Sequence, residues 1–361
     1  MIHLPAQPRI LVIRPDRLGD VVLSVPTVEA LKRTYPRSHL SFWVQPRVAP
    51  VVRGLPFVDE VQEIEPDKLS LAQWTRKIRE GRWDFALLLH PQFKIAAGLW
   101  WAGVPVRVGP LSKAFSYLFL NHGLRQHRSQ VEMHEADYNL QLLSVLGVHV
   151  GSRTILPQVV ISREARSEVA QFFGEGNSRP PQWVAIHPGM GGSALNWPES
   201  HYLALARELM EKGVGVVVTG GPAEQDLLDL FARELGEKWR DQLRVFGGKD
   251  AKHVDRLAAV FERVAVVVAP STGPLHVAVA LGRPVVTFYP PIRVQSARRW
   301  GPYVEDLPGR GGESLASVLV PQVVCGQAFQ CLGQACRFYP CMSTLSVTDA
   351  LDLVQNHLKR L

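Results

Sequence analysis

The sequence predicts an α/β protein made of two Rossmann-like lobes, each a doubly wound parallel sheet covered by helices. Short apolar runs of strand type alternate with helical patterns along the chain, which is the order of parallel βαβ units. The alternation restarts after the linker-like segment Gly176 to Pro181, and 361 residues suffice for two domains of ordinary size. We therefore expect one domain over residues 1–177, a second over 178–361, and a cleft where the two lobes face each other.

In the first half, the apolar run Arg9 to Arg14 leads into a polar, glycine-containing loop and a helical pattern from Val21 to Thr34. Leu40 to Val44 and Phe85 to Leu89 are further strand candidates. Lys94 to Val106 is apolar and flanked by cations. That segment fits either a core helix, the commoner case for an apolar stretch of this length, or a surface that lies on a membrane.

The second half repeats the alternation, again with a polar, glycine-containing loop after its first strand. Because ligands of doubly wound sheets bind beyond the carboxyl ends of the strands, each lobe is expected to bind one ligand there. The predicted strands are Trp183 to His187, Val214 to Thr219, Val264 to Ala269 and Val285 to Tyr289, and the predicted helices are 199–212, 223–236 and 251–262.

The end of the third of these strands predicts an anion site. Ser271, Thr272 and Gly273 follow the strand, and Pro274 opens an apolar helix, a common helix-start signal. The free N–H groups and positive dipole end of such a helix suit phosphate, although the segment also fits an ordinary strand-to-helix turn. His276 would lie in the first turn and reach the same anion.

Composition places the chain among globular proteins and narrows its partners. No apolar run reaches the roughly 18–20 residues of a transmembrane helix, and with no signal-peptide pattern the cytosol is the expected compartment. The net charge is +7, of which +5 falls within residues 1–150. That excess suits a phosphorylated or membrane-surface partner, or simply a solvated surface. No nucleic-acid-binding pattern is present, so no nucleic-acid partner is expected.

Two glycine-containing turns at strand ends suit close approach of a ligand to the backbone. One includes Gly189, and the other holds Gly220 and Gly221. The G-x-G-x-x-G order and the Walker sequence are both missing, which disfavours dinucleotide oxidoreduction and nucleotide hydrolysis. Asn196 and Glu199 have capping-box spacing, which favours a helix cap over a ligand-binding role for Asn196.

Five motifs together resemble those of one family. They are RPDRLGDVVLSVP at 14–26, HPGMGGSALNWP at 187–198, TGGPAE at 219–224, STGPLHVAVALGRPVV at 271–286 and RWGPY at 299–303. In their order and spacing the chain resembles glycosyltransferase family nine, the ADP-heptose:lipopolysaccharide heptosyltransferases and their relatives. The resemblance implies a GT-B fold whose first domain binds the acceptor, whose second binds the nucleotide-sugar, and whose C-terminal helix returns to the first domain.

The resemblance also implies the chemistry. The expected reaction is inverting transfer of a sugar, heptose from ADP-heptose, onto a lipid-linked glycan acceptor of a lipopolysaccharide core or related surface glycan. The enzyme would be cytoplasmic, or peripheral on the inner face of the cytoplasmic membrane. No metal cofactor is required in such enzymes, and this chain has no Asp-x-Asp motif to hold one. A nucleotide-sugar epimerase or hydrolase, or a non-catalytic nucleotide-sugar-binding relative, would fit the same scaffold.

Site residues follow from the matching positions. Asp20 matches the family's catalytic aspartate, the base that takes the acceptor hydroxyl proton; the alternative is that Asp20 only caps the helix beginning at Val21. Thr272, Gly273 and His276 match positions that hold the nucleotide diphosphate. The expected donor site comprises Gly189, Gly220, Gly221, Ser271, Thr272, Gly273 and His276.

Two positions depart from the family pattern. Leu195 stands where many members carry a Lys that serves the donor phosphates, and Ser271 stands where many carry an Asp associated with the donor sugar. Arginines would compensate for the missing Lys, since the guanidinium fork suits phosphate. The possible phosphate cations are Arg14, Arg17, Arg298 and Arg299.

All four cysteines fall in one segment: Cys325, Cys331, Cys336 and Cys341. In a cytosolic chain such a cluster favours a metal or free thiols over disulfides. The spacing lacks the Cys-x2-Cys knuckle of many zinc sites. A structural zinc or iron–sulfur site and four reduced thiols are both open interpretations, and no catalytic role is expected.

Overall fold

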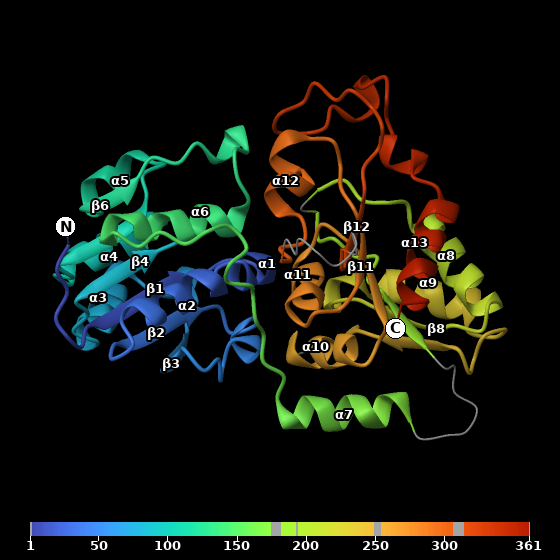
Figure 1. The fold of residues 1–361 in the computed structure, drawn as a ribbon, viewed down its shortest axis with the longest axis horizontal. Helices are drawn as coiled ribbons and strands as arrows, with labels where there is room; N and C mark the ends of the chain where they lie inside the picture. The colour runs from blue at the N-terminus through green and yellow to red at the C-terminus, as the bar shows by residue number, and fades with distance from the viewer. Residues whose placement is uncertain (1, 175–181, 193, 249–253, 306–313, 361) are drawn as a thin grey trace. The chain divides into compact units, whose positions relative to one another are not determined.

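The computed structural model folds into two compact units, and it describes residues 2–174, 182–192, 194–248, 254–305 and 314–360. The first unit comprises residues 1–128 and 132–160, and the second comprises 129–131 and 161–361. Each unit holds a six-stranded sheet with helices on both faces, as the alternation of strands and helices predicts (Figure 1).

The sheet of the first unit is parallel throughout and has the order β3-β2-β1-β4-β5-β6. The chain winds outward in one direction from β1 and then in the other from β4, so β1 and β4 form the topological switch point where doubly wound sheets bind ligands. The strands are β1 (Arg9–Arg14), β2 (His39–Val44), β3 (Glu60–Glu63), β4 (Phe85–Leu88), β5 (Val106–Pro110) and β6 (His122–Leu124).

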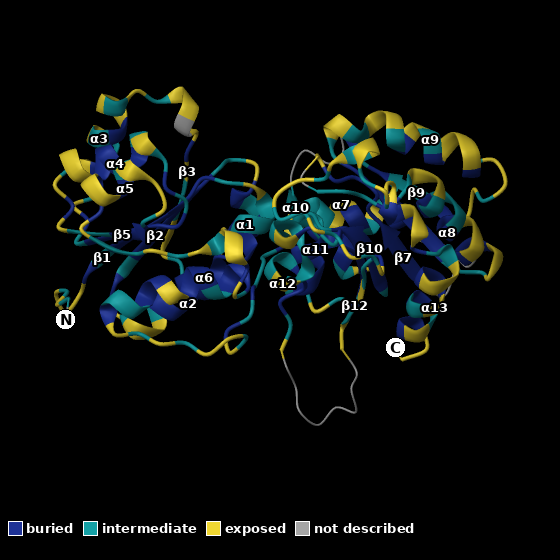
Figure 2. Ribbon diagram, turned by 90° about the horizontal axis from the view of Figure 1, so that it is seen from above, coloured by how far each residue is buried: buried dark blue, intermediate teal, exposed yellow. Residues whose placement is uncertain are grey.

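Helices cover both faces of this sheet. Side chains of α3 and α4, such as Trp74 and Leu99, pack on Leu11, Ile13 and Leu88 of the sheet. Figure 2 shows α3, α4 and α5 over one face and α2 and α6 over the other. The helices are α1 (Leu18–Val22), α2 (Val25–Thr34), α3 (Leu71–Glu80), α4 (Phe93–Trp101), α5 (Ala114–Phe119) and α6 (Glu135–Gln141).

The helix predicted over Val21 to Thr34 is two helices, α1 and α2, separated at Leu23 and Ser24. Pro26 explains the break, because proline has no N–H to donate to the carbonyl of Val22 in a continuous helix. The predicted single helix is therefore wrong. The break leaves the short α1 to carry Asp20 by itself.

The sheet of the second unit repeats the same winding, with the order β12-β11-β10-β7-β8-β9 and parallel pairing. Its switch point lies at β7 and β10. All four predicted strands are confirmed within two residues at each end. The strands are β7 (Trp183–Ile186), β8 (Gly215–Thr219), β9 (Leu243–Phe246), β10 (Val266–Pro270), β11 (Val285–Phe288) and β12 (Ala316–Leu319).

Runs of valine in β8 and β10 are buried on both faces, as expected of strands between two helical layers. Figure 2 shows the dark blue, buried strands β7 and β10 beside helices with exposed outer faces, such as α9. The helices of this unit are α7 (Arg163–Phe173), α8 (Glu199–Glu211), α9 (Gln225–Leu235), α10 (Val254–Glu262), α11 (Gly273–Ala280), α12 (Ala297–Trp300) and α13 (Val347–Leu358).

The compact units divide at residues 160 and 161, earlier than the predicted boundary, because α7 packs on α10 and so belongs to the second unit. The predicted linker, Gly176 to Pro181, lies outside the described residues. The C-terminal helix α13 lies in the second unit, and its return to the first domain stays a prediction. Its buried Ala350, Leu351 and Val354 join the hydrophobic core with α8, β10 and β11.

Trp197 is a centre of this core. Its ring stacks on Phe288 at 4.2 Å between centroids, meets the Tyr202 ring at 4.9 Å, and its Nε1 donates to the Leu345 carbonyl at 2.9 Å. The side chain is 1% exposed. The loop before α8, strand β11 and the segment before α13 are thus held together by one residue.

We predict that Trp197→Ala lowers the free energy of unfolding by about 3–5 kcal/mol, because a large buried ring leaves a cavity and an unpaired carbonyl. Denaturant titration followed by circular dichroism measures the change. Phe329→Ala in the same unit is the control, since Phe329 is 65% exposed. Equal losses in the two variants would show that Trp197 contributes no special packing.

Candidate functional site

The first unit has a cluster of charged side chains at its switch point, centred on Arg14. Arg14 is the last residue of β1 and is 2% exposed. Its Nη2 donates to Asp20 Oδ1 at 2.6 Å. Its Nε lies 2.9 Å from Asp16 Oδ2 as an ion pair, without the alignment of a hydrogen bond. Burial alone would lower the pKa of Arg14, but Asp20, Asp16 and Glu135 outweigh it and raise that pKa.

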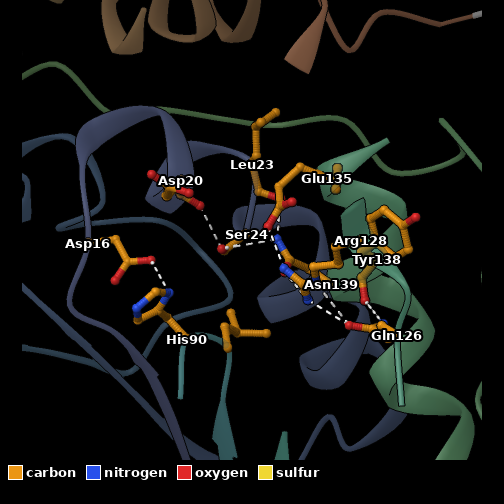
Figure 3. A network of polar contacts seen from close by, with 12 residues as sticks. Asp16, Asp20, Leu23, Ser24, His90, Gln126, Arg128, Glu135, Tyr138 and Asn139 are labelled. Atoms are coloured by element: carbon orange, nitrogen blue, oxygen red, sulfur yellow. Dashed lines mark hydrogen bonds and ion pairs between the residues drawn. The ribbon is translucent and has the colours of Figure 1, made fainter. Parts of the chain in front are cut away.

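Asp20 is the third residue of α1. The N-cap of that helix is Arg17, so the interpretation of Asp20 as a helix cap is wrong. A carboxylate in the first turn is still favoured by the helix dipole. The Ser24 hydroxyl donates to the Asp20 carbonyl at 2.7 Å (Figure 3). The side chain of Asp20 is thus oriented by Arg14, and its backbone is held by the next turn.

A second carboxylate, Asp16, bridges the switch point. Its Oδ2 lies 3.4 Å from Nδ1 of His90, which follows β4 (Figure 3). Burial raises the pKa of Asp16, against the opposing effect of Arg14, and burial lowers the pKa of His90, against the opposing effect of Asp16. Both shifts favour the neutral forms of the two groups.

The cluster is closed on the side of α6. Glu135 accepts from Arg128 and lies 3.6 Å from Nη2 of Arg14. Asn139, fully buried, donates to the Leu23 carbonyl and accepts from Arg14 and Arg128, each at 3.4 Å (Figure 3). The network ties β1, α1 and α6 together.

Exposure separates the roles of the three carboxylates. The side chains of Asp20, Asp16 and Glu135 are 21%, 12% and 2% exposed. A general base must reach the proton that it removes, which favours Asp20. Its hydrogen bond from Arg14 fixes one oxygen and leaves the second able to accept a proton.

In the second unit, the loop after β7 packs against the turn after β8. His187 is buried, with Nδ1 2.9 Å from Thr219 Oγ1 and Nε2 4.0 Å from Glu224 Oε2. Glu224 Oε2 also accepts from the backbone N–H of Gly221 at 2.7 Å. A Cβ on Gly189 would lie 1.7 Å from Glu224 Oε1, so a glycine is required there for the carboxylate to approach the loop.

The loop and the turn line an open pocket of about 470 Å³ in the second unit. Three acids, Glu199, Glu224 and Asp226, line it together with Gly189 and Gly191. Carboxylates accept hydrogen bonds from hydroxyl groups and repel phosphate. The pocket therefore suits the sugar hydroxyls of a nucleoside, and a phosphate needs a different place.

The N-terminus of α11, where the sequence predicts a phosphate site, lies next to the switch point. Thr272 is the N-cap and makes no side-chain capping bond, and Gly273 and Pro274 begin the helix. Ser271 to Pro274 are half-buried, so the first turn is accessible. His276 lies two residues beyond Pro274 and is 4% exposed. The sequence-predicted helix terminus is thus formed by the expected residues.

The predicted phosphate cations lie in different surroundings. The polar partners of Arg14 are carboxylates and other hydrogen-bond acceptors. Its guanidinium is therefore not available for a phosphate, which corrects its assignment as a phosphate-binding residue. Arg17 is exposed. Arg298 and Arg299 lie on α12 in the second unit, and the Arg299 guanidinium lies 4.7 Å from the centre of the Trp300 ring.

The positions of Leu195 and Asn196 explain the loop before α8. Leu195 packs against the hydrophobic core, so its side chain serves packing here. Asn196 was expected to cap α8, but the N-cap is Pro198. Asn196 instead donates to the Pro188 carbonyl at 2.7 Å and accepts from the Tyr202 hydroxyl at 3.0 Å. The predicted cap is wrong, because the side chain turns back to fix its own loop.

The four cysteine thiols are free and line one small apolar cavity with Leu195 and Phe338. Burial, and then the other three thiols, raise the pKa of Cys341. Within the described ranges, which include all four cysteines, no three His, Cys, Asp or Glu side chains are grouped so that they could hold a metal ion. A structural zinc or iron–sulfur site stays a hypothesis.

Several site residues escaped the sequence analysis: Asp16, His90, Arg128, Glu135, Asn139 and Glu224. His90 follows a predicted strand, so the strand-end rule applied to that strand would have found it. Asp16 and Glu224 lie inside quoted motifs and were passed over. The three residues contributed by α6 and the loop before it carry no local signal.

Known structures show the class of protein. A glycosyl transferase family 9 protein of Veillonella parvula superposes with a TM-score of 0.83 over 100% of this chain and 99% of its own, at 22% identity. The ADP-heptose lipopolysaccharide heptosyltransferase II of Escherichia coli superposes with a TM-score of 0.78 over 98% and 99%, also at 22% identity. The fold is that of the GT-B glycosyltransferases.

Sequence comparison narrows the class. The model described as Glycosyltransferase family 9 (heptosyltransferase) matches residues 71–309. A relative from Haemophilus influenzae is 30% identical over 302 residues, which cover 81% of this chain and 86% of the relative. The chain belongs to glycosyltransferase family 9. The resemblance found in its motifs is confirmed.

Three histidines with lowered pKa values generate a prediction for stability. Burial lowers the pKa of His187, against the opposing effect of Glu224, and lowers the pKa values of His90 and His357. The unfolded chain therefore binds more protons below the ordinary imidazole pKa of about 6.5, and stability falls as pH drops through that range. The raised pKa of Asp16 acts in the opposite sense, from about pH 4 upward.

We expect the melting temperature to fall between about pH 7 and about pH 5, and His187→Gln to reduce the slope. Differential scanning fluorimetry across this range tests it. His149→Gln, at an exposed histidine, should leave the slope unchanged. A flat profile for the unaltered protein would contradict the assignment of His187 and His357 as buried neutral groups.

Proposed function

We propose that this family 9 glycosyltransferase transfers heptose from ADP-heptose, with inversion, to the glycan of a lipid-linked acceptor of lipopolysaccharide-core type. The observation that carries the proposal is the presentation of Asp20 by the buried Arg14 at the switch point of the first unit. The donor rests on the E. coli ADP-heptose lipopolysaccharide heptosyltransferase II, which shares the fold. The division of labour is that the first unit binds acceptor and the second binds donor.

In the first unit, Asp20 takes the proton of the acceptor hydroxyl as the oxygen attacks the anomeric carbon of the donor. Arg14 orients the Asp20 carboxylate, since the Nη2 of this buried arginine donates a hydrogen bond of 2.6 Å to Asp20 Oδ1. The bond from the anomeric carbon to the diphosphate breaks as the new glycosidic bond forms. The leaving group is the nucleoside diphosphate, which carries the electron pair away.

In the second unit, Thr272, Gly273 and the N-terminus of α11 hold the diphosphate, and Ser271 and His276 flank it. Helix N–H groups and the dipole stabilise the charge that develops on the leaving group. Gly189, Gly220 and Gly221 let the nucleoside approach the backbone, and Glu224 accepts from its hydroxyl groups. Of the predicted phosphate cations, Arg298 and Arg299 belong to this unit.

The same arrangement leads us to propose that no divalent ion takes part in transfer. The enzyme would work on the cytoplasmic side of the membrane that carries its acceptor. No helix in the described part of the chain is long and apolar enough to span a bilayer.

We expect Asp20→Asn to lower the transfer rate by about 10²–10⁴, the typical contribution of a general base, with donor affinity nearly unchanged. Asp16→Asn is the matched control, because it neutralises a second carboxylate that contacts Arg14. It should cost less activity. Transfer of labelled sugar is measured in the presence of EDTA, where the unaltered protein should stay fully active.

Each alternative has its own outcome. A larger loss in Asp16→Asn than in Asp20→Asn would move the base to the Asp16–His90 pair. Donor consumption without acceptor would indicate an epimerase or hydrolase, and donor binding without turnover would indicate a non-catalytic relative. Inhibition by EDTA that Mg²⁺ reverses would contradict the metal-free mechanism.

We also expect Gly273→Val to weaken ADP binding by about tenfold or more, because a branched side chain in the first turn blocks anion access to charge-assisted N–H contacts. Isothermal titration calorimetry gives the dissociation constant, and His276→Ala should weaken binding in the same direction. Gly326→Val is the control, since open space surrounds Gly326. Unchanged affinity in both site variants would place the diphosphate elsewhere.

A further inference from the structure

Large apolar side chains are exposed together on α4 and α5 of the first unit. Phe93, Trp100 and Trp101 of α4 are 54%, 47% and 47% exposed, and Tyr117 and Leu118 of α5 are 55% and 70% exposed. These five, here called the aromatic patch, are all the large exposed apolar side chains found in the described part of that unit. Exposed apolar side chains that gather on one surface mark an interaction site.

The helix α4, which carries part of the aromatic patch, is anchored in the hydrophobic core. Residues Ile95 to Leu99 of α4 are buried in the core, so the helix is anchored and only its ends are uncovered. The Phe93 ring meets Phe119 at 5.6 Å, and Trp100 meets Phe119 at 6.0 Å, which links the two helices. The core-helix alternative for this segment is therefore confirmed for Ile95 to Leu99, and the membrane-surface alternative stays a hypothesis for the exposed ends.

The charge around the patch has one sign. No Asp or Glu occurs between Asp84 and Glu132, whereas Lys94, Arg107, Lys113, Arg125 and Arg128 fall in that stretch. Arg128 is paired with Glu135 in the polar network of the site, and the other four cations give this stretch a net positive charge that attracts anions.

Two guanidinium groups are fixed at the edge of the patch. Arg79 of α3 donates to the Trp101 carbonyl at 2.7 Å, and Arg107 donates from Nε to the Phe119 carbonyl at 2.7 Å. Both cations are thus held beside apolar side chains. An aromatic centre with a cationic rim matches the headgroup region of a bilayer that contains anionic lipids.

The patch adjoins the polar site of the same unit. Phe93 begins α4 three residues after His90, the partner of Asp16. Lys113, at the N-cap of α5, is close enough to His90 to contribute to its lowered pKa, after burial and Arg14. A surface held by the patch would lie next to the residues proposed to activate the acceptor.

We propose that the aromatic patch and its cations dock the first unit on a bilayer containing anionic lipids. The inference rests on the proposed function in one respect: it explains how a lipid-linked acceptor reaches the Asp16–His90 edge of the site. Tryptophan and tyrosine insert at the headgroup level, and the lysine and arginine side chains contact lipid phosphates. The occupant is the membrane surface itself, and no helix spans it.

The test is sedimentation of the full-length protein with vesicles, in the absence of donor and acceptor. Vesicles of phosphatidylglycerol mixed with phosphatidylethanolamine should bind it, and phosphatidylcholine vesicles should bind it much less. Leu118→Ser with Trp101→Ser should weaken binding about tenfold or more, since both side chains lose burial in the interface. Lys113→Glu should weaken binding at least about fivefold, equivalent to about 1 kcal/mol per surface cation.

Phe329→Ser is the control, a change at an equally exposed apolar residue of the second unit. Melting temperatures of all variants establish that they fold. Transfer to a water-soluble acceptor without its lipid should persist in the Leu118→Ser/Trp101→Ser variant, while transfer to acceptor in vesicles should fall. This separates the two proposals, because vesicle binding is read without any transfer reaction.

Equal binding of the patch variant and the unaltered protein to anionic vesicles would overturn the docking surface. So would a stable dimer in sedimentation velocity that the double change dissociates, together with no vesicle binding; the patch would then be covered by a second copy. Failure of ADP-heptose as donor, with vesicle binding intact, would count against the proposed function alone.

Discussion

The site of the first unit depends on a single buried guanidinium. Removing an ion from water costs several kcal/mol even after relaxation, so Arg14 is tolerated only because carboxylates and carbonyls surround it. Those partners come from the loop after β1, from α1 and from α6. The charge therefore does more than pair with Asp20. It requires these three segments to meet at one point. The orientation of the candidate base, Asp20, therefore depends on the packing of the whole unit.

The two units share one strand order but use their switch points differently. In the first, carboxylates and a guanidinium occupy the carboxyl ends of β1 and β4. In the second, a buried histidine, glycines and a helix N-terminus occupy the corresponding ends of β7 and β10. Fixed charges suit a proton transfer, and uncharged N–H groups suit the binding of phosphate. Under the proposed function, one architecture would thus provide two kinds of chemistry through the residues placed at equivalent positions.

The sequence predicted the strands well because strands buried on both faces, such as β8 and β10, are continuous valine runs. It also predicted the start of α11 at Gly273 and Pro274, whose signal is a local motif, while the catalytic role of Asp20 stays a prediction. It failed where distant segments decide the outcome. Glu135 and Asn139 contact Arg14 although they lie more than a hundred residues away in the sequence. No sequence pattern predicts that contact. Asn196 has the spacing of a capping box, but its side chain instead bonds to the Pro188 carbonyl and the Tyr202 hydroxyl.

Trp197 has a consequence for how this protein can change over time. Its indole joins the loop that lines the pocket of the second unit to a carbonyl 148 positions later in the chain. The segment around Leu345 and the helix after it do not line that pocket. They nevertheless help to hold the loop in place. Substitutions there would move the loop, so a region outside the pocket shares the constraints on the pocket's shape.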